Sequence, residues 1–149
     1  MTNDPTGRAT DHEFRVRWGE TDAFGIVFYP TFYAWMDQAT HEFFRTEKGA
    51  FMSMLADDGY GFPIIEAGCK FSAPARYDDL LMVASVVTDV RSRTFRIDHR
   101  FTRDGQKLAR GFEVRAFAAS DPDNPTRLTT TPFPDTVRRF LAGDSDAPI

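Results

Sequence analysis

The sequence predicts an α+β fold in which one long central helix is wrapped by an antiparallel sheet. Apolar residues recur at helical spacing in a single long stretch that begins at Pro30. From residue 64 to about residue 120 the pattern changes to the alternation of strands. The turn sequence at residues 104–106, Asp-Gly-Gln, separates two of these strands as in a hairpin. Consecutive strands after one helix favour an antiparallel sheet that covers the helix.

The elements of the first half follow from local signals. Residues 12–18 alternate apolar with charged side chains, which predicts a strand. A helix is expected to begin at Pro30, because proline at the first helical position has no N–H to leave unpaired. We expect this helix to end near Lys48-Gly49 and a short second helix to cover residues 50–57.

Strands dominate the second half. The alternation predicts strands at residues 64–73, 79–90, 93–103 and 107–120, then a loop, a last strand piece at 127–131 and a helix at 134–141. The third of these strands places Phe95, Ile97, His99 and Phe101 on one face, so we expect His99 to be a hydrogen-bonded core residue. Residues 12–141 form one predicted domain, and the polar ends, 1–11 and 142–149, are expected to be flexible tails.

Composition excludes several classes of protein. The chain has 149 residues, 42% of them hydrophobic, and a net charge of -4 without the basic stripe of a nucleic-acid-binding protein. It has no apolar run long enough to cross a membrane and no apolar signal-peptide core. The single cysteine, Cys69, excludes an intramolecular disulfide, and no Cys/His group has zinc spacing. We therefore expect a cytoplasmic protein that needs no metal or cofactor.

Two acids precede an apolar run, in the stretch "RWGETDAFGIVFYP". Burying a carboxylate is costly, so Asp22 beside the run 23–29 calls for an explanation. This stretch and the following helix, together with "PARYDDLL" at 74–81 and "VRSRTF" at 90–95, resemble the 4-hydroxybenzoyl-CoA thioesterase family of the hotdog fold, in its bacterial, Asp-dependent branch. The resemblance covers about residues 12–120.

The resemblance implies hydrolysis of an acyl-CoA thioester, and local chemistry agrees with it. Asp22, as a poorly solvated carboxylate, would attack the carbonyl or activate water, and the sequence leaves both routes open. Gly25 permits a backbone conformation closed to other residues. The backbone N–H of Tyr29, before Pro30, lies free at a helix start that would polarise the thioester oxygen. Glu20, where the family usually has Asp, is interpreted as structural.

Four further residues are assigned to substrate binding through the resemblance. Asp37 implies an acceptor for a para-hydroxyl group in the acyl pocket of a neighbouring subunit, the alternative being a solvated helix position. Phe62 stands where the family has a small hydroxyl residue, which changes the expected pocket. Arg91 and Arg93 are expected to bind the CoA phosphates, since arginine suits phosphate through its forked donors. Of the aromatic residues Phe32, Tyr33 and Trp35, at least two are expected to be plain core.

The sequence thus predicts an acyl-CoA thioesterase with 4-hydroxybenzoyl-CoA or a related aryl-CoA as the favoured substrate. Two alternatives remain open at this point, a thioesterase for short aliphatic acyl-CoA or acyl-carrier thioesters and a non-catalytic thioester-binding protein. Because a sheet with one helix leaves long unpaired edges, we also expect a homo-oligomer, a dimer with shared sites and by resemblance a tetramer.

Overall fold

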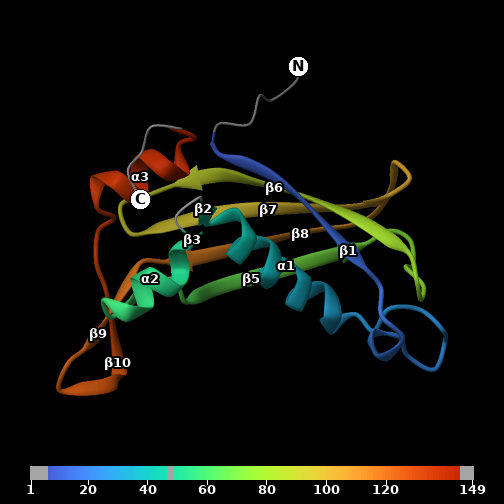
Figure 1. Cartoon of the computed structure of the whole chain (residues 1–149), viewed down its shortest axis with the longest axis horizontal. Helices are drawn as coiled ribbons and strands as arrows, with labels where there is room; N and C mark the ends of the chain where they lie inside the picture. Colours follow the sequence, from blue (N-terminus) through green and yellow to red (C-terminus); the bar gives the residue numbers. More distant parts are fainter. Residues whose placement is uncertain (1–6, 47–48, 145–149) are drawn as a thin grey trace.

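The computed structural model describes residues 7–46 and 49–144. A curved antiparallel sheet of five strands lies behind one long helix, α1, which crosses its face (Figure 1). The strand order is β1-β6-β7-β8-β5. These strands are β1 (Ala9–Arg15), β5 (Ile64–Phe71), β6 (Leu80–Val90), β7 (Thr94–Arg103) and β8 (Gln106–Ala116). The strands predicted in the second half are present, and β6, β7 and β8 pair in chain order. β5 pairs with β8 and not with β6, the next strand along the chain. The fold is the hotdog.

The long helix α1 (Pro30–Phe43) begins at the predicted proline and packs against the sheet with one face. Its buried residues are Phe32, Trp35, Met36, Ala39, Thr40 and Phe43. Tyr33 is only partly buried, so two of the three aromatic residues are core, as expected. Opposite this face, Ala34, Gln38 and His41 are exposed in the single chain.

The prediction that the helix ends near Lys48-Gly49 is wrong. The helix ends at Phe43, and the next residue, Phe44, leaves it to pack with Phe62 and Phe140. The chain then forms a two-stranded ribbon from β2 (Arg45–Thr46) and β3 (Gly49–Ala50). Lys48 itself lies outside the described residues. The end of α1 is therefore determined by burial of the Phe44 ring and not by the predicted stop signal at Lys48-Gly49.

Small elements extend one end of the main sheet. They are α2 (Phe51–Asp57), β4 (Tyr60–Gly61), β9 (Ala118–Asp121), β10 (Asn124–Thr130) and α3 (Asp135–Leu141). The predicted strand 107–120 is two strands, because the chain breaks at buried Phe117 and passes from the main sheet into the three-stranded sheet β10-β9-β4. The predicted strand piece at 127–131 is part of β10, and the second helix begins one residue later than predicted.

The N-terminal boundary also differs. β1 begins at Ala9 and pairs with β6 along its whole length, so residues 9–11 belong to the sheet and not to a tail. The predicted strand to Trp18 ends instead at Arg15, and Trp18 begins a short 3-10 turn, η1 (Trp18–Glu20). Residues 1–6 and 145–149 of the predicted tails lie outside the described residues.

The core consists of two apolar clusters along α1. One surrounds its first half and includes Phe32, Trp35 and Phe101. The other is built largely from phenylalanines at the end near α3, among them Phe44, Phe62, Phe95, Phe117 and Phe140. Between them α1 comes so close to β8 that a Cβ added to Gly111 would lie 2.3 Å from the sulfur of Met36. Glycine at this position lets the helix lie directly over β8.

Among the described residues, no helix is both long and apolar enough to cross a bilayer.

Candidate active site

The loop that carries Asp22 is closed by its own hydrogen bonds. The Phe28 N–H donates to the Glu20 carbonyl over 2.8 Å, and the Asp22 N–H donates to the Ile26 carbonyl over 2.8 Å. At the tip, the Gly25 N–H donates to the Asp22 carbonyl over 2.9 Å, and Gly25 has φ +74°, as predicted. Nearly all of these contacts join near neighbours in the chain, which explains why the local sequence could predict the turn.

The carboxylate of Asp22 is partly buried and held by one oxygen. Its Oδ1 accepts the Phe24 N–H at 2.8 Å, an Asx turn that fixes the side chain over the loop. Within the described part of the chain, Oδ2 has no hydrogen-bond partner. Glu20 instead accepts the Arg17 N–H at 2.7 Å through Oε2 and closes the 3-10 turn, in agreement with the structural interpretation. One carboxylate oxygen of Asp22 is therefore anchored and the other is available.

A free backbone donor lies at the start of α1. Tyr29 has helical backbone angles, φ −55° and ψ −34°, and its N–H makes no hydrogen bond to any residue that the structure describes. Pro30, the first residue of the helix, has no N–H, and the preceding N–H of Phe28 is already bonded. The helix dipole adds partial positive charge here. This arrangement suits a carbonyl oxygen that becomes negative during reaction.

An aromatic cavity of about 540 Å³ adjoins this donor. Phe24, Tyr29, Phe32 and Phe71 are among the residues that line it. The apolar run 23–29 thus walls the cavity, as its composition predicts, although Phe24 is 86% exposed and only Val27 of the run is buried. Val27 is anchored by its N–H to the Ala75 carbonyl, whereas the neighbouring rings project outward. The cavity is thus open on one side in the single chain.

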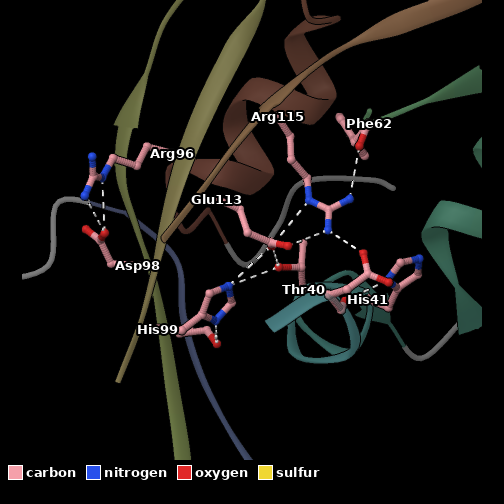
Figure 2. Close-up of polar contacts among 10 residues, drawn as sticks. Thr40, His41, Phe62, Arg96, Asp98, His99, Glu113 and Arg115 are labelled. Carbon is pink, nitrogen blue, oxygen red and sulfur yellow. Dashed lines mark hydrogen bonds and ion pairs between the residues drawn. The ribbon is translucent and has the colours of Figure 1, made fainter. Parts of the chain in front are cut away.

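Asp37 belongs to a polar cluster between α1 and the sheet. Figure 2 shows Arg115, Glu113 and His99 of this cluster. Its Oδ1 accepts Nη2 of Arg115 at 2.6 Å, and the Asp37 side chain is 49% exposed. The Arg115 guanidinium also binds the buried carboxylate of Glu113, at 2.9 Å from Nη2 to Oε2. Glu113 in turn contacts Thr40 and His99. Asp37 is therefore not a plain solvated helix position.

Burial and charge act in opposite directions on Glu113. Burial alone would raise the pKa of its carboxyl group, but hydrogen bonds from His99, Thr40 and Arg115 and the charge of Arg115 hold this pKa at about 2. His99 is also buried and bonded through Nδ1 to the Ser85 hydroxyl at 2.7 Å, which confirms the prediction of a hydrogen-bonded core residue. The cluster thus contains an ionised carboxylate inside the fold.

Sequence reasoning missed Glu113 and Arg115, although a signal was present. β8 pairs with β7 across the predicted hairpin, which places Glu113 opposite Ile97 and Arg115 opposite Phe95. Ile97 and Phe95 were already assigned to the inner face. Directly opposed residues of paired strands share a face, so both charges were bound to point inward.

Phe62 lies mainly in the core. Its ring is 4% exposed and packs on Phe44, with 5.0 Å between ring centroids. It also forms part of the wall of a second cavity, about 460 Å³, beside His41 and Arg115. Its carbonyl accepts Nη1 of Arg115 at 3.1 Å. The effect of Phe62 on the substrate pocket stays a prediction.

Arg91 and Arg93 lie where β6 turns into β7, beside α3 and at the opposite end of the sheet from the Asp22 loop (Figure 1). Arg91 is 77% exposed and pairs with Asp89 at 3.0 Å. Arg93 donates to the Thr130 carbonyl at 2.9 Å. β6 has 11 residues and spans roughly 35 Å at the usual rise per residue. The structure therefore does not bring these arginines to Asp22 of the same chain.

Cys69, interpreted as an unlikely nucleophile, is partly buried, and burial raises the pKa of its thiol to about 11. At neutral pH the thiol stays protonated and hence weakly nucleophilic. Cys69 is therefore not an alternative nucleophile to Asp22.

Comparison with known proteins identifies the family of this chain. The model of the thioesterase superfamily matches residues 24–110. The 4-hydroxybenzoyl-CoA thioesterase of Pseudomonas sp. (strain CBS-3) is 28% identical over 121 residues, which cover 76% of this chain and 86% of the relative. Its solved structure has a TM-score of 0.78 at 27% identity and covers 90% of this chain and 99% of that one. The BH1999 gentisyl-coenzyme A thioesterase is 37% identical with a TM-score of 0.77, covering 87% and 99%.

The family match begins at Phe24 and spans α1, β5, β6, β7 and the first part of β8. The relatives named are thioester hydrolases. Because the family match covers more than half of the chain, the reaction class is the hydrolysis of acyl-CoA thioesters. The chain belongs to the thioesterase superfamily, as a hotdog-fold acyl-CoA thioesterase.

Proposed function

We propose that the protein hydrolyses hydroxyaryl-CoA thioesters such as 4-hydroxybenzoyl-CoA, with Asp22 as the reacting carboxylate. The observation that carries this proposal is the combination of two groups near an aromatic cavity. The Asp22 carboxylate has one oxygen fixed by a hydrogen bond and the other available, and the Tyr29 N–H at the start of α1 has no partner among the described residues. The similar proteins named for hydroxybenzoyl-CoA and gentisyl-CoA support an aromatic acyl group with a hydroxyl substituent.

The reaction converts a thioester and water into a carboxylic acid and free CoA thiol. The thioester carbonyl oxygen would accept the Tyr29 N–H, which stabilises the negative charge formed on attack. The free oxygen of Asp22 would either attack the carbonyl carbon, giving an anhydride that water then opens, or remove a proton from the attacking water. In both routes the CoA sulfur leaves as thiolate and takes up a proton.

Asp37 would accept the hydroxyl group of the acyl ring. Its Oδ2 makes no hydrogen bond to the residues that the structure describes. His41 Nδ1 lies 3.8 Å from Oδ2 and contacts the Asp37 carbonyl at 2.7 Å instead. A site built for a hydroxyl discriminates strongly when that partner is missing, because a buried polar group is left unpaired.

A panel of acyl-CoA substrates, assayed by release of free thiol, tests this proposal. We expect 4-hydroxybenzoyl-CoA to have the highest kcat/KM, followed by benzoyl-CoA and then by short aliphatic acyl-CoA. Asp37→Ala should lower turnover of 4-hydroxybenzoyl-CoA at least tenfold more than that of benzoyl-CoA. Faster turnover of butyryl-CoA by the wild type would instead support the aliphatic alternative.

The site is proposed to be shared between two chains. The cavity beside Tyr29 is open, and the rings of Phe24 and Phe28 project from the single chain. Among the residues that the structure describes, the edge strands of the main sheet, β1 and β5, also lack a partner on one side. A second copy that covers these features would form at least a dimer, with a tetramer as the expected assembly. Light scattering at assay concentration measures this, and an active monomer would contradict it.

Arg91 and Arg93 are proposed to bind the CoA nucleotide in such an assembly. The nucleotide they bind would belong to a substrate whose thioester lies in the site of another chain. Arg91→Ala and Arg93→Ala should each raise KM for acyl-CoA about tenfold, because hydrogen bonds to charged groups contribute about 1.5 kcal/mol or more. KM for an acyl-pantetheine thioester, which lacks the nucleotide, should stay within about twofold. Arg100→Ala, an exposed arginine further along β7, is the matched control. Equal changes for both substrates would place the nucleotide elsewhere.

A further inference from the structure

The polar cluster around Arg115 has a feature that hydrolysis itself does not require. Arg115 is 4% exposed and Glu113 is 1% exposed (Figure 2). Their chain of contacts nevertheless ends at Asp37, whose side chain is half-exposed. A buried arginine is costly unless its donors are paired. Here the pairing extends from the interior to a residue at the surface of α1.

The guanidinium of Arg115 is fixed in its plane by interior acceptors. Nε donates to Glu113 Oε1 at 3.3 Å and Nη2 to Glu113 Oε2 at 2.9 Å, which is the forked geometry that arginine forms with a carboxylate. Nη1 donates to the Phe62 carbonyl at 3.1 Å. Glu113 is itself held by Thr40 and His99. These contacts leave the head group little freedom to turn.

The same fixed head group holds Asp37. Nη2 of Arg115 is 2.6 Å from Oδ1 of Asp37, so one carboxylate oxygen is tied and Oδ2 is presented in a set direction. A half-exposed aspartate on a helix would otherwise sample several rotamers, and ordering it would cost free energy whenever a ligand binds. Arg115 removes that cost in advance.

The charge of the cluster restricts which acyl group can approach. Arg115, Glu113 and Asp37 together carry one positive and two negative formal charges. The Asp37 end is therefore a hydrogen-bond acceptor with surplus negative charge. It suits a neutral donor such as a phenolic hydroxyl and disfavours an acyl group that ends in a carboxylate.

We propose that Arg115, held by Glu113, is a positioning residue that sets the preference for hydroxylated acyl groups by fixing the Asp37 carboxylate. This inference rests on the proposed function, in which Asp37 accepts the acyl hydroxyl. In this inference the buried ion pair of Arg115 and Glu113 on β8 contributes to substrate specificity and takes no part in the bond-breaking step.

The test compares kcat/KM for 4-hydroxybenzoyl-CoA with kcat/KM for benzoyl-CoA. Arg115→Lys keeps the charge but loses the fork, and we expect it to lower this hydroxyl preference about tenfold while benzoyl-CoA turnover stays within about threefold. Arg96→Lys is the matched control, since Arg96 forms an ion pair with Asp98 at 3.1 Å elsewhere on the sheet. Its hydroxyl preference should equal that of the wild type.

Two further variants make the outcome decisive. In an Asp37→Ala background, Arg115→Lys should change the preference no further, because both act through one carboxylate. If Arg115→Lys folds poorly, Glu113→Gln combined with Arg115→Met removes both buried charges, leaves neither unpaired, and should lower the preference in the same way. Folding is checked by circular dichroism.

The outcomes separate this inference from the proposed function. One outcome is that Asp37→Ala lowers the hydroxyl preference while well-folded Arg115 variants keep the preference of the wild type. This outcome would overturn only the positioning role of Arg115. An unchanged preference in Asp37→Ala would overturn hydroxyl recognition by Asp37, and the positioning role with it. Equal losses on both substrates in Arg115→Lys would reduce Arg115 to a structural residue and overturn the inference.

Discussion

Replacing Asp22 by Asn is expected to lower kcat by a factor of about 10³ or more, which corresponds to about 4 kcal/mol of transition-state free energy. Asn has nearly the same size, and its Oδ1 can still accept the Phe24 N–H that anchors the loop. It can neither attack a carbonyl as a carboxylate nor take a proton from water. The fold and the binding of CoA should therefore survive while hydrolysis is lost.

Steady-state hydrolysis, with circular dichroism to confirm folding, measures this effect. Glu20→Gln is the matched control, because its carboxylate accepts the Arg17 N–H and an amide oxygen can do the same. Its kcat should stay within about tenfold of the wild type. A well-folded Asp22→Asn protein with most of its kcat would refute the role of Asp22. Label from ¹⁸O-water found in Asp22 after many turnovers would support direct attack.

Replacing Glu113 by Gln is expected to lower the free energy of unfolding at pH 7 by about 3 kcal/mol. The substitution keeps the shape of the side chain and its capacity to accept a hydrogen bond. It removes the charge that faces buried Arg115, which then keeps the half-exposed Asp37 as its one ionic partner among the described residues. Urea unfolding of both proteins measures the difference.

The ion pair of Glu113 and Arg115 also predicts that the free energy of unfolding depends on pH. The pKa of Glu113 lies at about 2 in the folded protein, below the ordinary value of 4.5, so the unfolded chain binds more protons between these two values. The stabilisation is complete above about pH 4.5 and is lost as pH falls toward 2, and it amounts to on the order of 3 kcal/mol. In Glu113→Gln this loss should be absent, and the two proteins should converge near pH 2.

An exposed ion pair provides the comparison. Asp89→Asn, which removes the partner of Arg91, should cost less than about 1 kcal/mol at pH 7 because water screens both groups. If Glu113→Gln were as mild as Asp89→Asn, the buried carboxylate would not stabilise the fold through its charge.

Local sequence was sufficient wherever the contacts are local. The start of α1 at Pro30 and the hairpin at residues 104–106 were predicted correctly, because proline, glycine and the alternation of apolar residues act within a few positions. The end of α1 was not predicted, since it depends on Phe44 packing against Phe62 and Phe140, which are distant in sequence. The start of β1 at Ala9 likewise depends on pairing with β6.

The candidate site divides in the same way. The sequence by itself determined the loop around Asp22, since Glu20, Asp22 and Gly25 form its turn through bonds to near neighbours. Only the tertiary structure decided the surroundings of Asp37, because Arg115 lies 78 residues away and meets it across the helix–sheet contact. That contact requires α1 close over β8 at Gly111, and no local pattern encodes such a distance.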